Sequence, residues 1–290
     1  MSAAIISGKD VSAEIREQIR EEVFEIFERY GKDPHFCPPG LAVIQVGQDP
    51  ASSIYVSNKK KACEQVGFMS FGYALPEDTR EDELIELINT LNDDPRVHGI
   101  LCQLPLPRHI DEFSVICAIS PDKDVDGFHP VNKGLLSIGR DCLVSCTPLG
   151  CLALLKNKGI PIAGKKCVIV GRSNIVGKPV ALLMLSENAT VTIAHSKTAD
   201  LKAVCREADI LIAAIGKSEF ITKDYVKPGA IVIDVGINRG EDGKVRGDVA
   251  FEEVSEICGA ITPVPGGVGP MTITMLLQNT LKAYKMKTGR

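Results

Sequence analysis

A chain of 290 residues is long enough for one large domain or two moderate ones. Its composition, 44% hydrophobic and 24% charged, is typical of a globular protein, and a net charge of −4 gives no reason to expect nucleic acid or a membrane surface as a partner. No apolar run approaches the roughly 18 residues of a membrane span. The first residues, MSAAIISGKD, lack the features of a signal or transit peptide, so we expect a cytoplasmic protein.

The first half of the chain alternates between helix and strand patterns. Residues 11–30 place apolar side chains at helical spacing, and residues 41–46, LAVIQV, form an apolar run typical of a buried strand. A helix over about 55–66 and a strand over about 69–75 follow. Residues 79–92 repeat leucine and isoleucine at three- and four-residue steps, which predicts an amphipathic helix, and GILCQL is the next strand. This alternation indicates parallel strands joined by crossover helices.

Turn-rich sequence interrupts the pattern between about 120 and 150, and a second alternating series follows. Strands are predicted at KCVIVG, TVTIA, DILIAAIG and AIVIDVG, and a final helix from about Met271. We interpret the chain as an α/β protein of two domains with a boundary near residue 148. The expected domains are residues 1–148 with 271–290, and residues 149–270.

The cysteines and histidines give little support for a metal site. The ten cysteines include no C-x-x-C pair and no zinc-type spacing with the five scattered histidines. Cys142, Cys146 and Cys151 are the closest group, and we interpret them as reduced packing residues. We therefore expect no bound metal.

The stretch VIVGRSNIVGKP, residues 168–179, has the order strand, glycine turn and helix that dinucleotide-binding folds use. It departs from G-x-G-x-x-G because Ser173 and Val176 stand at the second and third glycine positions, while Gly171 and Gly177 remain. Small residues here would let backbone N–H groups and the helix N-terminus approach a phosphate. The alternative is a tight turn that binds no ligand.

The residues after the strand TVTIA indicate which dinucleotide the turn would accept. NAD-binding folds often have an acidic residue there for the ribose hydroxyls, whereas this chain has His195, Ser196 and Lys197. Arg172 in the glycine turn adds a positive charge. Positive and hydroxyl groups without a carboxylate favour a 2′-phosphate, hence NADP over NAD. We select Arg172 and Ser196 for this role and leave Lys197 open as solvated surface.

Tyr55 and Lys59 stand four residues apart and share one face of the predicted helix, with Ser52 one turn earlier. The pattern Y-x-x-x-K resembles the catalytic pair of short-chain dehydrogenases. In those enzymes, however, the pair follows the nucleotide motif, whereas Tyr55 precedes Gly171 and lies in the other predicted domain. This order excludes the short-chain interpretation and leaves either a different site or ordinary amphipathic surface.

Two further polar residues stand where a site is expected. Gln103 lies at the carboxyl end of the predicted strand GILCQL, the edge at which open α/β sheets bind ligands. Asp126 belongs to DKDVDG, a turn with several carboxylates, at least one of which we expect to do more than face solvent. A solvated Asp-Gly turn is the alternative for Asp126.

Six stretches resemble those of one known family. They are YVSNK (55–59), ELINTLNDDPRVHGILCQLPLP (86–107), DKDVDGFHP (122–130), CTPLG (146–150), GRSNIVGKP (171–179) and PGGVGPMTI (265–273). Over nearly its whole length the chain resembles the bifunctional methylenetetrahydrofolate dehydrogenase/cyclohydrolase enzymes of one-carbon metabolism. The resemblance implies oxidation of 5,10-methylenetetrahydrofolate to the methenyl cation with NADP⁺, then hydrolysis to 10-formyltetrahydrofolate at the same site.

The resemblance also implies an architecture. The family has two α/β domains that form a cleft, the second a Rossmann-type NADP-binding domain, and a final helix that packs back on the first domain. It is usually a homodimer that binds tetrahydrofolate derivatives.

The resemblance further implies roles for the residues selected above. Lys59 matches the catalytic lysine of the hydrolysis, and Gln103 matches the glutamine that positions it. A lysine must be partly neutral to move protons, so its pKa has to fall below about 10.4. Tyr55 matches the tyrosine that stacks on the aminobenzoyl ring, and Asp126 the acceptor for the pterin N–H groups. Ser52 matches a further substrate residue.

The remaining implied residues belong to hydride transfer, which needs alignment of substrate and nicotinamide rather than a protein base. Pro265, Gly266 and Gly267 match substrate-binding positions in a stretch whose glycines permit close approach. The implied coenzyme-binding residues are Thr147, Gly171, Arg172, Ser173, Ser196, Gly236 and Ile237. Two alternatives stay open: a dehydrogenase with little cyclohydrolase activity, and a non-catalytic nucleotide- or folate-binding protein.

Overall fold

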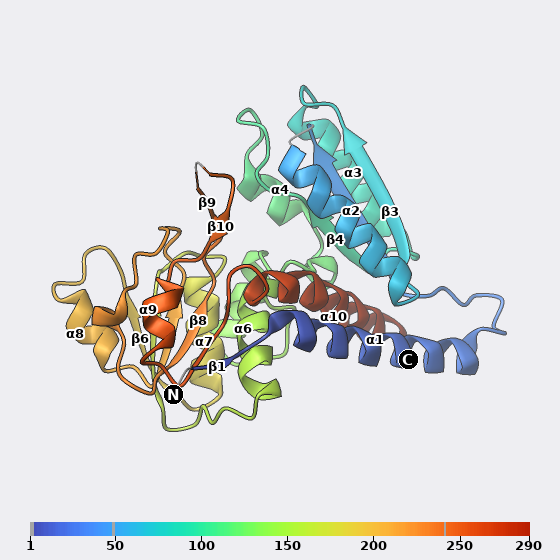
Figure 1. The fold of residues 1–290 in the computed structure, drawn as a ribbon. Coiled ribbons are helices and arrows are strands. Elements are labelled where there is room, and N and C mark those ends of the chain that lie inside the picture. The colour runs from blue at the N-terminus through green and yellow to red at the C-terminus, as the bar shows by residue number, and fades with distance from the viewer. Residues whose placement is uncertain (1–2, 48–49, 241) are drawn as a thin grey trace. The chain divides into compact units, whose positions relative to one another are not determined.

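The computed structural model describes residues 3–47, 50–240 and 242–290, and the side chains of residues 50–55 lie outside the description. The chain forms two compact units. Unit 1 comprises residues 1–13 and 147–272, and unit 2 comprises residues 14–146 and 273–290. Each unit contains a parallel sheet with helices (Figure 1), which confirms the α/β prediction.

Unit 1 is built on a six-stranded parallel sheet in the order β1-β11-β8-β7-β5-β6. Its strands are β1 (Ala4–Ile5), β5 (Lys166–Val170), β6 (Thr190–Ala194), β7 (Ile210–Ala213), β8 (Ile231–Asp234) and β11 (Ala260–Ile261). The β7 strand is buried along its whole length, as expected for an apolar run covered on both faces. The strand order reverses between β5 and β7, and ligands of such sheets bind beyond the carboxyl ends of the strands at that point.

The helices of unit 1 follow its strands in the manner of crossover connections. They are α6 (Cys146–Asn157), α7 (Gly177–Ser186), α8 (Leu201–Arg206) and α9 (Phe251–Ser255), with a 3-10 turn at Lys223–Tyr225. A two-stranded antiparallel ribbon, β9 (Asn238–Arg239) with β10 (Val245–Arg246), projects from the end of β8 (Figure 1). The core beneath these elements includes Val168, Leu211, Val232 and Val254.

Unit 2 contains a three-stranded parallel sheet in the order β3-β2-β4. The strands are β2 (Gly40–Val46), β3 (Met69–Leu75) and β4 (Gly99–Cys102), and the helices are α2 (Pro50–Gln65), α3 (Glu81–Asp93), α4 (Glu112–Ala118) and α5 (Pro130–Ser137), with a 3-10 turn at Pro121–Lys123. The apolar stripe of α3, with Leu84, Ile88 and Leu91, packs against Ile44 and Ile100 of the sheet. This packing places the end of β4 beside α2 and the turn that follows Lys123.

Two long helices, α1 (Gly8–Tyr30) and α10 (Val268–Thr288), lie side by side within unit 2 over most of their length (Figure 1). Arg16 Nε donates to Thr274 Oγ1 at 2.9 Å, and Lys285 forms an ion pair with Glu22. The buried face of α1 includes Ile19, at 4% exposure. The end of the chain is thereby returned to the unit that contains β2, β3 and β4.

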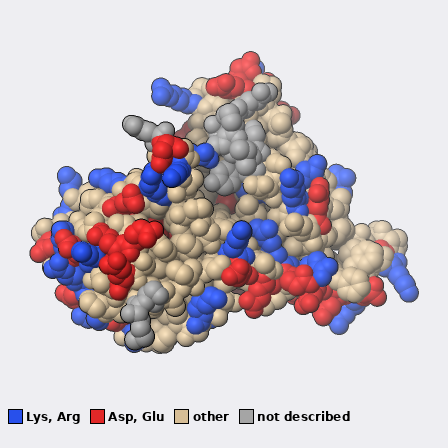
Figure 2. Space-filling view, viewed as in Figure 1, with Lys and Arg blue, Asp and Glu red and all other residues tan. Residues whose placement is uncertain are grey.

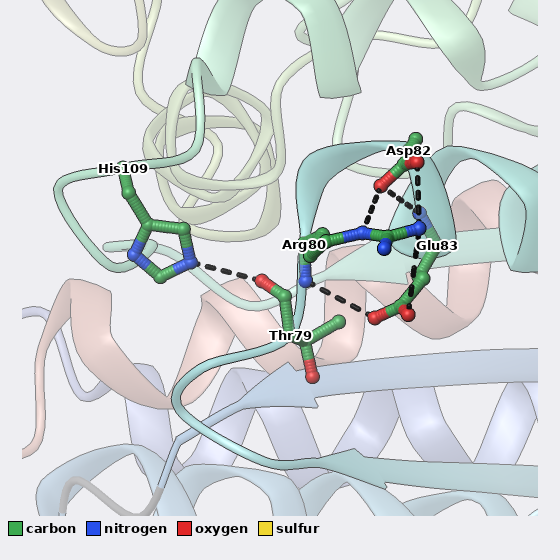
Figure 3. Close-up of polar contacts among 5 residues, drawn as sticks. All are labelled: Thr79, Arg80, Asp82, Glu83 and His109. Carbon is green, nitrogen blue, oxygen red and sulfur yellow. Dashed lines mark hydrogen bonds and ion pairs between the residues drawn. The ribbon is translucent and has the colours of Figure 1, made fainter.

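The start of α3 is organised by polar contacts at its first turn (Figure 3). The Glu83 carboxylate accepts a hydrogen bond from Arg80 N, and the Arg80 guanidinium pairs with Asp82 at 2.8 Å. His109 Nε2 lies 2.9 Å from the carbonyl oxygen of Thr79. Acidic side chains at a helix N-terminus offset its exposed N–H groups, so these contacts account for where α3 begins.

The structure differs from the sequence expectation at two places. Helix α10 begins at Val268, before the expected Met271. Residues 1–13 fall in unit 1 and not with the residues that follow them, because β1 pairs with β11 at the edge of the six-stranded sheet.

The surface carries both signs of charge. Basic and acidic side chains are interspersed over the face drawn in Figure 2, in keeping with the small net charge. Across the described part of the chain, no helix is long and apolar enough to cross a membrane.

Candidate active site

The side chains of Lys59 and Gln103 meet at the carboxyl end of β4. Lys59 on α2 donates from Nζ to Gln103 Oε1 at 2.8 Å. The other end of the Gln103 amide is fixed as well, because Nε2 donates to the Leu104 carbonyl at 2.7 Å. The backbone N–H of Gln103 bonds Ile44 of the neighbouring strand at 2.8 Å. The amide therefore has one orientation, with its oxygen toward the ammonium group.

The surroundings of Lys59 favour its neutral form. The residue is only 9% exposed, and burial lowers the pKa of its ammonium group, while Asp126 acts in the opposite direction. Its hydrogen-bond acceptor is a neutral amide, which does not hold the proton as a paired carboxylate would. A lowered pKa brings a buried lysine closer to the range in which it exchanges protons with a substrate.

The three carboxylates of the turn after Pro121 differ in how deeply they are buried. Asp122 is exposed, whereas Asp124 is 2% exposed and accepts hydrogen bonds from Phe128 N, His129 N and Asn132 Nδ2 at 3.1, 2.8 and 2.9 Å. Asp124 therefore holds the turn and the start of α5. Asp126 is partly buried, and burial raises its pKa to about 6 against the opposing effect of Lys59.

A side chain of helix α10 also holds this turn. Asn279 is 3% exposed, and its Nδ2 donates to the carbonyl oxygens of Val125 and Val144 at 2.7 and 2.8 Å. Cys146 Sγ donates to the same Val125 carbonyl at 3.3 Å, and burial raises the pKa of this thiol well above its usual value. These bonds fix the backbone on the N-terminal side of Asp126.

Two sequence-predicted residues of this region, Ser52 and Tyr55, fall in α2, but their side chains lie outside the described residues. The structure thus brings together three of the five predicted folate residues of unit 2: Lys59, Gln103 and Asp126.

In unit 1 the predicted glycine turn connects β5 to α7. Gly171 has φ +134°, and a Cβ there would overlap the carbonyl oxygen of Ala214 after β7. A Cβ at Gly177 would likewise overlap the carbonyl oxygen of Gly171. Ser173 Oγ accepts from the N–H groups of Val176 and Gly177 at 3.1 and 3.2 Å. The turn is therefore closed on itself: the N–H groups of Gly177, Lys178 and Val180 in the first turn of α7 all bond Ser173 or Val176.

The predicted 2′-phosphate residues are exposed. Arg172 lies in the glycine turn, and Ser196 lies in the turn after β6. That second turn is ordered by His195, whose Nδ1 accepts from Lys197 N at 3.1 Å and whose N–H donates to Thr198 Oγ1 at 2.9 Å. An exposed guanidinium and a hydroxyl suit a phosphate ester, so these residues fit the group for which they were selected.

The remaining predicted residues of unit 1 lie in three places. Gly236 and Ile237 follow β8, and Ile237 is 54% exposed although it is apolar. Thr147 Oγ1 lies 3.2 Å from Thr272 Oγ1. Pro265, Gly266 and Gly267 connect β11 to α10, and Gly266 O accepts from Lys9 N at 3.1 Å. The PGG turn thus belongs to unit 1, whereas Lys59, Gln103 and Asp126 belong to unit 2.

Sequence analysis missed the buried polar residues that hold these turns: Asp124 and Asn279 in unit 2, and Asp234 and Asp248 in unit 1. Asp124 lies in a turn-rich stretch and Asp234 ends an apolar strand, and neither sequence pattern shows which groups would donate hydrogen bonds to the carboxylate. The one available signal is an acidic residue next to valine in DVDG, DVGI and GDVA. For the described residues, the structure contains no group of three or more His, Cys, Asp or Glu side chains able to hold a metal ion.

Comparison with known proteins assigns the chain to a family. Residues 6–126 match the tetrahydrofolate dehydrogenase/cyclohydrolase catalytic domain, and residues 145–288 match the NAD(P)-binding domain of the same family. The bifunctional protein FolD of Ruminiclostridium cellulolyticum is 56% identical over 289 residues, which is 100% of each chain.

Solved structures agree with this assignment. The bifunctional methylenetetrahydrofolate dehydrogenase/cyclohydrolase of Campylobacter jejuni has a TM-score of 0.94 at 49% identity, covering 99% of this chain and 100% of its own. The Trypanosoma brucei enzyme, complexed with NADP and an inhibitor, has a TM-score of 0.93 at 38% identity, covering 100% of both chains. The resemblance identified in the sequence is confirmed, and the chain belongs to the tetrahydrofolate dehydrogenase/cyclohydrolase family.

Proposed function

We propose that this protein oxidises 5,10-methylenetetrahydrofolate with NADP⁺ and hydrolyses the resulting 5,10-methenyl cation to 10-formyltetrahydrofolate. The observation that carries the proposal is the bond from Lys59 Nζ to Gln103 Oε1 at 2.8 Å, in a chain of this family. A family member with only the dehydrogenase activity would not need a buried lysine held by a neutral amide. The intact pair therefore favours the bifunctional enzyme over the dehydrogenase alternative.

The hydrolysis depends on proton transfer at Lys59. Water adds to the electrophilic methenyl carbon and loses a proton, and the ring then opens as one ring nitrogen gains a proton. Because burial lowers the pKa of Lys59, its amine is able to accept the first proton and return one to the leaving nitrogen. Gln103 holds the amine in place through both changes of charge, since an amide oxygen remains an acceptor throughout.

Asp126 is proposed to bind the pterin ring. Its carboxylate offers two oxygens to the amino and ring N–H groups, and its pKa of about 6 leaves it ionised at neutral pH. Ser52, Tyr55 and the turn Pro265, Gly266 and Gly267 are proposed as further substrate-binding residues on the basis of their match to the family.

NADP⁺, when bound, supplies the acceptor for the hydride. The chain's part is to orient the coenzyme, and the proposed residues are Thr147, Gly171, Arg172, Ser173, Ser196, Gly236 and Ile237. The exposed apolar side chain of Ile237 supports this assignment. Arg172 and Ser196 would hold the 2′-phosphate, which supports NADP over NAD.

The experiment that tests this function compares Lys59→Met with Lys60→Met. Lys60 is the matched control because it is adjacent in α2 but exposed. Methenyl hydrolysis, followed by loss of the methenyl absorbance, should fall at least about 10²-fold in Lys59→Met and remain unchanged in Lys60→Met. Equal rates in the two variants would contradict the role of Lys59, and a wild-type protein without NADP⁺-dependent oxidation would contradict the dehydrogenase.

We further propose that the protein is a cytoplasmic homodimer. All ten cysteines are free thiols, which suits a reducing compartment. Strand β6 stands at one end of the order of the six-stranded sheet, and Ile193 on it is 40% exposed although it is apolar. An edge strand with an apolar side chain offers a pairing surface to a second copy. Light scattering of the wild-type protein and of Ile193→Lys measures the mass, and the variant should be monomeric.

A further inference from the structure

A buried carboxylate, Asp248, holds two loops at the carboxyl edge of the unit 1 sheet. It is 0% exposed. Oδ2 accepts from Ile215 N and Gly216 N at 2.6 and 3.0 Å, and Oδ1 accepts from Lys217 N at 2.9 Å. Oδ1 also accepts from Asn238 Nδ2 at 2.9 Å. Both oxygens are thus saturated by the loop after β7 and by Asn238 beyond β8.

A second buried carboxylate, Asp234, fixes Asp248 in turn. It ends β8, is 3% exposed, and accepts from Gly236 N and Asp248 N through Oδ1 and from Val249 N through Oδ2, each at 2.9 Å. Burial raises the pKa of Asp234 to about 6, and these three N–H groups oppose that shift. The two carboxylates therefore connect the ends of β7 and β8 to the segment after β10.

The glycines of these loops make room for the two carboxylates. A Cβ at Gly236 would overlap Oδ1 of Asp248, and a Cβ at Gly247 would overlap Oδ2 of Asp234. Close approach at Gly236 is therefore an approach by the protein's own side chain. The fold itself therefore requires glycine at position 236, whether or not a ligand binds there.

The loops held by Asp248 lie where a dinucleotide would bind. The strand order reverses between β5 and β7, and the carbonyl oxygen of Ala214 after β7 occupies the space beside Gly171 of the glycine turn. The exposed Ile237 directly follows Gly236. Displacement of the loop after β7 would move Ala214 beside the glycine turn, and displacement of the loop after β8 would move Ile237.

We propose that Asp248 is a positioning residue for the coenzyme, which sets the two loops beyond β7 and β8 in the arrangement that NADP⁺ requires. This inference rests on the proposed dehydrogenase function. It assigns the carboxylate no contact with the coenzyme, because both of its oxygens are already saturated by the protein. Its effect passes through the backbone of residues 215–217 and through Asn238.

The test uses three variants of the full chain: Asp248→Asn, Asn238→Asp, and the two changes together. Asp248→Asn places an NH₂ group against two donors, Lys217 N and Asn238 Nδ2. Asn238→Asp places two carboxylates together. In the double variant the amide at position 248 donates to the carboxylate at position 238, which restores this one contact with reversed polarity, while Lys217 N still faces the NH₂ group.

NADP⁺ binding by calorimetry and the KM for NADP⁺ are the measurements. Each single change should weaken NADP⁺ binding at least about tenfold, as expected for bonds to a buried charged group, and the double variant should bind NADP⁺ at least about threefold more tightly than Asp248→Asn. Coenzyme-free methenyl hydrolysis should stay within about twofold in all three. A merely structural role would not produce this combination of selective loss and rescue.

Singly changed proteins that bind NADP⁺ as the wild type does would overturn the proposal, as would loss of hydrolysis in parallel with loss of binding. Should Asp248→Asn fail to fold, Asn238→Ala removes the side-chain bonds to Asp248 and Arg246 O but keeps the three backbone bonds of Asp248, and an unchanged KM for NADP⁺ in that variant would equally overturn it. Failure of the proposed function is distinguished by the wild-type protein, which would then show no NADP⁺-dependent oxidation at all.

Discussion

The carboxyl ends of the strands carry different kinds of polar group in the two units. In unit 2, Gln103 at the end of β4 and Lys59 beside it bond each other through side chains, and Lys59 is held by one neutral acceptor. In unit 1, Asp234 at the end of β8 and the nearby Asp248 accept seven hydrogen bonds, six of them from backbone N–H groups. Lys59 and Gln103 are thus joined through their side chains, whereas Asp234 and Asp248, like Asp124 of unit 2, fix backbone.

The comparison is sharpest for Asp126 and Asp234, whose pKa values burial raises to about 6 in both cases. The oxygens of Asp234 are occupied by three N–H groups. The electrostatic partners of Asp126 are side chains, foremost Lys59, and among the described residues no backbone N–H group bonds it. The same shift therefore accompanies a proposed ligand-binding role in one unit and a structural role in the other.

This difference corresponds to the two reactions. Hydrolysis of the methenyl cation requires proton transfers, which need titratable side chains at the site. Hydride transfer requires the two reacting carbons to be held in line, and a rigid, ordered backbone around substrate and coenzyme provides this alignment. The following variants test whether changes in unit 2 affect only the hydrolysis and changes in unit 1 affect only the coenzyme.

Gln103→Leu should have the largest effect. Removal of the acceptor leaves the ammonium group of Lys59 buried without its hydrogen bond, and the amine loses its orientation. Methenyl hydrolysis should fall about 10²-fold while NADP⁺ binding, measured by calorimetry, stays at the wild-type value.

Gln103→Glu is the informative companion to that variant. A carboxylate at this position would raise the pKa of Lys59, opposite to the lowering by burial, so more of the lysine would stay protonated. The pH–rate profile of hydrolysis should shift to higher pH. An unshifted profile would mean that Lys59 is not the titrating base.

Much of the architecture behind these expectations could be predicted from sequence, because the strands β2, β5, β7 and β8 are apolar runs long enough to be distinctive. Strands β1 and β11 have two residues each, and two residues show no periodicity. Pairing with the long strands makes them part of the sheet. Only the tertiary structure reveals these two strands, and only it reveals that residues 1–13 belong to unit 1.

The candidate site likewise contains residues that could be predicted from sequence and residues that could not. Helical spacing and a strand end draw attention to Lys59 and Gln103, but their pairing is implied only by the family resemblance, with which their bond at 2.8 Å agrees. The parts played by Asp248 and Asn279 could not be predicted, because each binds backbone groups that lie far away in the chain. Hydrophobic periodicity carries no information on such bonds, since it records which face is buried and not which acceptor lies beneath a loop.

The pH dependence of folate binding should show an effect of intermediate size. The pKa of Asp126 is raised to about 6, so the carboxylate is ionised above that pH and becomes protonated below it, losing acceptor capacity for the pterin N–H groups. Tetrahydrofolate affinity should therefore fall about tenfold per pH unit below pH 6 and be constant above it. Calorimetric titration between pH 5 and 8 measures this dependence.

Asp126→Asn provides the control, since an amide does not titrate in that range. Its tetrahydrofolate affinity should be low and independent of pH. A variant that retains the wild-type dependence would show that another group in the site titrates near pH 6, and would transfer the assignment away from Asp126.

Arg172→Ala should have the smallest effect, and it examines a polar residue of unit 1 that is exposed, unlike Asp234 and Asp248. Arg172 is exposed in the glycine turn, so its pairing with a 2′-phosphate is screened by solvent and contributes about 1 kcal/mol, or about fivefold in affinity. The KM for NADP⁺ should rise by this factor while the KM for NAD⁺ stays constant. Lys178→Ala, which changes an exposed cation that bonds Asn174 within the same segment, is the matched control. Equal losses for both coenzymes would mean that the turn recognises the shared pyrophosphate, and that its specificity for NADP resides in Ser196 and the turn after β6.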